Sequence, residues 1–182
     1  MFLADGFEET EAVCPLDLLR RAGVRVKTVA VGTPDNKVTG AHGIILTADI
    51  TEAELSYDKN ELEMVILPGG KLGAENLDKS DAVSSYLALA DDKGAYIAAI
   101  CAAPYIPGKR GYLRGRRAVC YPGFEELLSG AVISDNPPQV EVDGNLITGQ
   151  AMGASLQFGL ALTAILCKEE MADKLAAAVI KR

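Results

Sequence analysis

The chain of 182 residues has a length and composition typical of one globular domain, with 49% hydrophobic and 24% charged residues. Its formal net charge of −7 argues against nucleic acid or an anionic membrane as a partner. No apolar run is long enough to cross a bilayer and no signal peptide is evident. We therefore expect a single cytoplasmic domain over residues 1–182.

Short apolar runs alternate with helical periodicity along the chain, which is typical of a doubly wound α/β sandwich. We expect a mostly parallel central sheet with helices on both faces. In chain order the predicted elements are a strand at 2–4, a helix at 8–21, a strand at 24–31, a hairpin at 38–46, a strand at 64–67, helices at 73–79 and 81–92, strands at 96–100 and 117–120, a short helix at 124–129, a type I′ hairpin of 139–142 with 146–148, and helices at 153–166 and 168–180.

Two residues near the start of the chain are candidates for acid–base chemistry. Glu11 lies one helical turn before the apolar Cys14 and Pro15, so we expect it to face inward with a raised pKa and to donate a proton. His42 is the only histidine, so any Ser-His-Asp or Cys-His mechanism must use it. A lone histidine in a glycine-rich turn is more often a surface residue, and both interpretations of His42 stay open here.

The four cysteines favour thiol chemistry over a disulfide scaffold or a zinc site. They are scattered, and no CxxC or CxxxC pair occurs among Cys14, Cys101, Cys120 and Cys167. Cys101 ends the buried strand at 96–100, where the amides of a following helix would lower its pKa and favour the thiolate. Free cysteine is also commonly buried, so packing is the alternative.

Several candidates are predicted to meet where parallel strands end, which is where ligands collect in an open α/β sheet. Gly69-Gly70 follows the strand at 64–67, and adjacent glycines let backbone N–H groups approach a ligand. Cys101, Tyr121 and the Glu11 turn follow other strands. This shared position favours a reactive thiol over simple packing. No GxSxG, GxGxxG or GxxxxGK[ST] string occurs, so a serine hydrolase and nucleotide binding lack support.

Three motifs in order resemble the ThiJ/PfpI superfamily, nearest to its parkinsonism-associated deglycase (glyoxalase III-like) branch. They are ADGFEETE at residues 4–11, LPGG at 67–70 and AICAAP at 99–104, and LITGQAMG at 146–153 resembles a later loop of the same branch. The resemblance runs almost end to end. It implies a flavodoxin-like fold, a homodimer and a reactive cysteine on a nucleophile elbow.

The same resemblance assigns roles to single residues. Cys101 would be the nucleophile, Glu11 the protonatable carboxyl beside its sulfur, and Gly70 and Ala102 the oxyanion-binding amides. Tyr121 stands where many members carry a histidine and completes the catalytic candidates. A phenol with a pKa near ~10 is a poor base at neutral pH, so a cysteine protease mechanism is disfavoured.

Three further residues are candidates for the pocket wall, namely Gly69, His42 and Gln150. Gln150 lies where relatives often carry arginine, and the loss of that cation weakens the case for anion binding there. We expect no metal and no cofactor, because the chemistry assigned to Cys101 requires neither.

Two functions use the same residues. A glyoxalase or deglycase would convert a small aldehyde or ketoaldehyde, such as methylglyoxal to lactate, in stress protection. A redox sensor or chaperone would instead oxidise Cys101 to a sulfinate held by protonated Glu11. We favour carbonyl chemistry, because a thiol with an acid–base partner is the more general catalytic arrangement. Thiazole phosphate (thiamine) metabolism and peptide cleavage have the least support.

Overall fold

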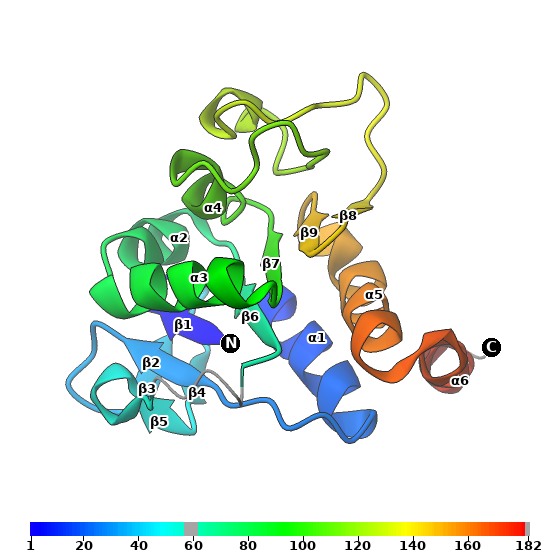
Figure 1. The fold of residues 1–182 in the computed structure, drawn as a ribbon. Helices are drawn as coiled ribbons and strands as arrows, with labels where there is room; N and C mark the ends of the chain where they lie inside the picture. The colour runs from blue at the N-terminus through cyan, green and yellow to red at the C-terminus, as the bar shows by residue number, and fades with distance from the viewer. Residues whose placement is uncertain (57–61, 181–182) are drawn as a thin grey trace.

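Strands and helices alternate along most of the chain in a computed structural model that describes residues 1–56 and 62–180 (Figure 1). The predicted α/β class is therefore confirmed. In chain order the strands and α-helices are β1 (Phe2–Ala4), α1 (Glu9–Arg21), β2 (Val29–Val31), β3 (Lys37–Thr39), β4 (Ile45–Thr47), β5 (Ile50–Thr51), β6 (Met64–Leu67), α2 (Lys71–Asp78), α3 (Asp81–Lys93), β7 (Tyr96–Ile100), α4 (Tyr105–Lys109), β8 (Val140–Asp143), β9 (Leu146–Gly149), α5 (Ser155–Cys167) and α6 (Glu169–Ile180). Short 3₁₀ turns add η1 (Glu52–Glu54), η2 (Glu125–Leu127) and η3 (Met152–Ala154).

Parallel pairing dominates the strands at the centre of the fold. One hydrogen-bonded sheet has the order β1-β2-β5, a second has the order β6-β7-β9-β8, and β1 contacts β6. Within these two sheets only the β8–β9 pair is antiparallel. The β3–β4 hairpin forms a separate antiparallel pair. The predicted mostly parallel sheet is confirmed.

Alternate residues of the central strands enter two different hydrophobic clusters. In β7, Ile97 and Ala99 belong to the cluster that α2 and α3 cover, whereas Ala98 and Ile100 belong to the cluster that α1 and α5 cover. A strand with apolar layers on both faces has no polar side, which explains why its sequence runs apolar without alternation. The apolar sequence of this strand therefore predicts that helices cover both faces of the sheet.

Capping residues mark the start of α1 and both ends of α3. The Glu8 side chain caps α1 by accepting a 2.7 Å hydrogen bond from the Glu11 N–H. The Ser80 hydroxyl caps α3 at the Val83 N–H, and Gly94 ends α3 in the left-handed conformation with φ +70°. The cap on α1 bears directly on the site, because it fixes the turn from which Glu11 projects.

The strand predicted at 117–120 is wrong, although Ala118, Val119 and Cys120 are buried as expected. Only Arg117 makes a bridge, to Val132. The Val119 N–H donates a 2.9 Å hydrogen bond to the Thr148 hydroxyl instead of to a strand carbonyl. A side-chain acceptor therefore replaces the ladder that would have made this segment a strand.

Two further predictions differ from the structure in detail. The strand predicted at 24–31 begins at Val29, where its ladder with β1 starts opposite Phe2. The β8–β9 turn is of the type II′ kind rather than I′, because Gly144 has φ +60° whereas Asn145 has no positive φ. The short β5 strand was not predicted, because two paired residues give no periodic signal.

Candidate active site

Cys101 occupies a sharp bend directly after β7. Its φ of +66° is one of only two positive values at non-glycine residues in the described part of the chain. The Cys101 N–H donates to the Gly149 carbonyl at 2.9 Å, and the Cys101 carbonyl accepts from the Tyr121 N–H at 2.8 Å. Left-handed backbone costs a non-glycine residue about 1–2 kcal/mol, so these two bonds hold the strained bend that a nucleophile elbow requires.

Glu11 is completely buried next to this bend. Its Oε2 accepts a 2.9 Å hydrogen bond from the Gly69 N–H, whereas its Oε1 has no hydrogen-bond partner among the described residues. Burial raises the pKa of Glu11 from 4.5 to about 7, and the neighbouring Cys101 and the Gly69 N–H oppose part of that rise. The predictions that Glu11 faces inward and has a raised pKa are confirmed.

The thiol of Cys101 does not have the lowered pKa that the sequence predicts. Burial and the charge of Glu11 raise the pKa of Cys101 to about 12, although hydrogen bonds from the Gly70 and Ala102 N–H groups act to lower it. The predicted helix is also short, since α4 has five residues and begins four positions after the thiol. Two amides alone therefore do not outweigh burial and an adjacent carboxylate.

The two groups have to be treated as one titrating pair. Glu11 has a pKa of about 7, and Cys101 has a pKa of about 12 beside the ionised carboxylate. The pair is therefore about half ionised at pH 7 and carries a single negative charge in the mildly alkaline range above it. A shift of one proton from Sγ to the carboxylate moves that charge onto sulfur, where the Gly70 and Ala102 N–H groups are directed.

Gly69 lies between the Glu11 carboxyl group and Cys101, where only a residue without a side chain fits. A Cβ atom at this position would lie 2.5 Å from Glu11 Oε2, 2.7 Å from Cys101 Cβ and 2.8 Å from the Ile100 carbonyl oxygen. All three distances are too short for real contacts, so no side chain fits here. The candidate pocket residue Gly69 is thus a spacer whose N–H orients Glu11.

Tyr121 and Gln150 lie next to the elbow through their backbones. Tyr121 is linked to Cys101 by its N–H, while its side chain is 47% exposed and packs edge-on against Phe124 with 6.1 Å between ring centroids. Gln150 follows the Gly149 carbonyl that accepts from Cys101, and its own N–H donates to Gln139. Their side-chain roles stay predictions.

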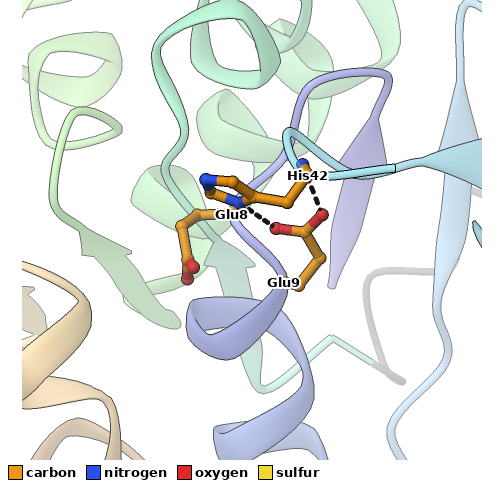
Figure 2. A group of neighbouring side chains, drawn as sticks. All are labelled: Glu8, Glu9 and His42. Carbon is orange, nitrogen blue, oxygen red and sulfur yellow. Dashed lines mark hydrogen bonds and ion pairs between the residues drawn. The ribbon is translucent and has the colours of Figure 1, made fainter. Parts of the chain in front are cut away.

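His42 lies on the β3–β4 loop and is tied to the start of α1 (Figure 2). Its N–H and its Nδ1 approach the two oxygens of Glu9, at 2.6 Å and 2.8 Å respectively. The His42 side chain is 73% exposed, which agrees with the surface interpretation, and its hydrogen bond with Glu9 raises its pKa. The hydrogen bonds described for His42 go to Glu9 and none links it to Cys101, so the described contacts give a Cys-His dyad no support.

Residues 1–165 match the DJ-1/PfpI family. The chain belongs to this family. The Parkinson disease protein 7 homolog of Danio rerio is 34% identical over 181 residues, which cover 99% of this chain and 95% of the relative. A protein of Pyrococcus abyssi named as a deglycase is 29% identical over 150 residues, covering 82% of this chain and 87% of the relative.

A solved DJ-1/PfpI structure gives the same fold. Toxoplasma gondii DJ-1 in an oxidised form has a TM-score of 0.89 and 31% identity, and the match covers 98% of this chain and 95% of that one. The family and the flavodoxin-like fold that the motifs implied are therefore confirmed. Among the described residues of this family member, no helix is long and apolar enough to span a membrane.

Sequence reasoning missed two residues that shape this DJ-1/PfpI site. The sequence does not single out Glu9, yet it is buried and holds the His42 loop. Thr148 was interpreted only as part of β9, yet its hydroxyl anchors the segment that leads to Tyr121. The only signal for Glu9 was the crowding of three glutamates into one turn, and Thr148 gave none.

Proposed function

We propose that the protein is a cofactor-independent cysteine enzyme that acts on small reactive carbonyls and converts methylglyoxal to lactate. The observation that carries the proposal is the buried Glu11 carboxyl, with a pKa of about 7, beside a thiol on a strained elbow. An acid–base group titrating near neutral pH is suited to proton transfer in both directions. The deglycase name of the Pyrococcus relative supports the same substrate class.

The reaction would begin with addition of the thiol to the aldehyde carbon. Cys101 gives its proton to the Glu11 carboxylate, sulfur forms a bond to carbon, and the carbonyl oxygen takes the negative charge. The Gly70 and Ala102 N–H groups are placed to stabilise this oxyanion. Protonation of the oxygen by Glu11 gives a hemithioacetal and returns the carboxylate.

An internal redox step would follow without an external oxidant. Glu11 removes the hydrogen of the former aldehyde carbon as a proton, and the ketone oxygen takes up a proton, giving an enediol. A proton is then added to the neighbouring carbon while the hydroxyl on the former aldehyde carbon loses its proton. The aldehyde carbon is thereby oxidised to a thioester and the ketone carbon is reduced to an alcohol. Water then hydrolyses the lactoyl thioester and regenerates the Cys101 thiol, so that methylglyoxal and water give lactate.

The proposal is tested by following methylglyoxal loss and lactate formation for the wild type and for Cys101→Ser. We expect Cys101→Ser to lose at least 100-fold in kcat/KM, because a hydroxyl is a far weaker nucleophile than a thiol. Cys167→Ser, which changes a cysteine at the end of α5, is the matched control and should keep the wild-type rate. Equal rates in wild type and Cys101→Ser would overturn the proposal.

A redox role for Cys101 is the second candidate, and the unpartnered Oε1 of Glu11 favours it. A protonated Glu11 could donate a hydrogen bond from this atom to a sulfinate oxygen. The oxidised form of the Toxoplasma relative supports the same chemistry. Mild peroxide should oxidise Cys101 before Cys14, Cys120 and Cys167, and peptide mass analysis would show the order. Any other order of oxidation would contradict sensing.

We also propose a cytoplasmic homodimer with reduced thiols. All four cysteines are free. Exposed apolar residues on α1 and at the start of β4 support self-association: Val13 is 42% exposed, Ile45 is 60% exposed, and Ile44, directly before β4, is 56% exposed. Light scattering after size exclusion should give about twice the chain mass of 19.2 kDa. Ile45→Asp should shift the protein to monomer, whereas Val142→Asp, on β8, should not.

A further inference from the structure

We propose that Glu8, Glu9 and His42 form a binding site for one divalent transition-metal ion, with Zn²⁺ as the best match. The site is separate from the chemistry proposed at Cys101, which needs no metal. Figure 2 shows the three side chains at the point where the β3–β4 loop meets the start of α1. One potential ligand atom from each residue lies within 4.8 Å of the others.

The three donors come from two elements that the backbone already holds together. The Ala41 N–H donates to the Phe7 carbonyl at 2.8 Å, directly beside the cluster. Glu9 Oε1 accepts the His42 N–H at 2.6 Å, which leaves Oε2 for an ion. Glu8 uses Oε2 to cap α1, which leaves its Oε1. Outer hydrogen bonds of this kind fix the orientation of metal-binding carboxylates.

His42 and Glu9 are close to the geometry of a metal site, and the Glu8 donor lies within 4.8 Å of both. His42 Nδ1 and Glu9 Oε2 are 2.8 Å apart, and a tetrahedral zinc ion with bonds of about 2.0–2.1 Å needs these atoms about 3.3 Å apart. The ring has to shift by about half an ångström, which is easy for a side chain that is 73% exposed. Glu9 is nearly buried and can stay in place.

The charge balance of the cluster favours a cation. Once His42 has released its proton, as a metal-binding imidazole must, the two carboxylates give the cluster a charge of −2, whereas the amino end of α1 contributes about +0.5. One imidazole and two carboxylates are ligands that suit Zn²⁺, and a fourth position stays open for water. A bound ion would join α1 to the β3–β4 loop and stabilise the folded protein by mass action.

Isothermal titration of the metal-free full chain with zinc chloride tests the proposal. We expect one ion per chain, and a rise in Tm of about 5 °C or more when free zinc exceeds the Kd 100-fold. His42→Ala and Glu8→Gln should each weaken binding at least tenfold. Glu8→Gln retains a cap acceptor, and circular dichroism of the metal-free variants checks that both fold.

Two controls separate this site from thiol-bound zinc. Cys101→Ser should bind zinc as the wild type does, and Co²⁺ in place of Zn²⁺ should show no sulfur-to-metal charge-transfer band. Glu126→Gln, an exposed carboxylate on η2, should also leave the affinity unchanged. The proposal is overturned if the wild type binds no ion, if His42→Ala binds with unchanged affinity, or if Cys101→Ser abolishes binding.

Discussion

Replacing Glu11 by glutamine should stabilise the protein at high pH while removing its activity. In the wild type the pKa of Glu11 rises from 4.5 when unfolded to about 7 when folded. The folded state therefore binds a proton that the unfolded state releases between these values, so the contribution of Glu11 to stability is fully present below pH 4.5 and is lost as pH rises to 7. Each pH unit corresponds to about 1.4 kcal/mol, which gives a loss of about 3 kcal/mol.

Glutamine at position 11 has no charge to bury, so the variant should not lose this stability. Its Oε1 can accept from the Gly69 N–H, while its amide nitrogen faces the unpartnered side of the site. The free energy of unfolding of Glu11→Gln, minus that of the wild type, should increase by about 3 kcal/mol between pH 4 and pH 8.5. The rate of methylglyoxal loss should fall at least 100-fold, because the amide cannot exchange the proton.

Urea unfolding at several pH values measures this difference directly. The His42–Glu9 pair titrates in both proteins and cancels in the subtraction. Glu126→Gln, which changes an exposed carboxylate, is the control and should follow the wild type at every pH. A difference between Glu11→Gln and wild type that stays constant within about 0.5 kcal/mol would refute the raised pKa of Glu11 and the role built on it.

Three other substitutions test the geometry of the site. Gly69→Ala should cost about 1–3 kcal/mol in urea unfolding and lower kcat/KM at least tenfold, since the added carbon would collide with Glu11 and Cys101; full activity would contradict this. Cys101→Gly should be about 1 kcal/mol more stable than Cys101→Ala, since glycine accepts φ +66° without strain; equal stability would mean an unstrained elbow. Thr148→Val should cost about 1–3 kcal/mol, because the buried Val119 N–H loses its acceptor; an unchanged unfolding midpoint would contradict that.

The sequence was sufficient for the α/β class, and its resemblance to the ThiJ/PfpI superfamily named the groups that lie next to the thiol, namely Glu11, Gly70 and Ala102. Apolar runs such as residues 96–100 predict a buried strand by composition alone. The helical spacing of Glu11 from Cys14 predicts that the Glu11 side chain faces inward. The pKa of Cys101 could not be predicted in the same way. It depends on how closely a buried carboxylate approaches the sulfur, and that approach is set by contacts such as Gly69 N–H to Glu11, made between residues 58 positions apart.

The irregular segment before Tyr121 could not be predicted from the sequence for the same reason. Its residues have the composition of a strand, yet the Thr148 hydroxyl supplies an acceptor that only the folded chain brings near. The Glu9–His42 contact is also long-range, since the two residues lie 33 positions apart. Local patterns therefore predicted the elements, and single hydrogen bonds between distant segments decided the details.

The link between Tyr121 and the elbow has a consequence for sequence variation. Position 121 supports the bend at Cys101 through a main-chain N–H, and about half of its side chain is exposed to solvent. Nineteen of the twenty amino acids can supply that donor, so this position can change its side chain during evolution without disturbing the nucleophile. Proline alone is excluded, because it has no N–H to give. Relatives can thus exchange a tyrosine for a histidine here and adjust chemistry at the rim while the reactive bend stays the same.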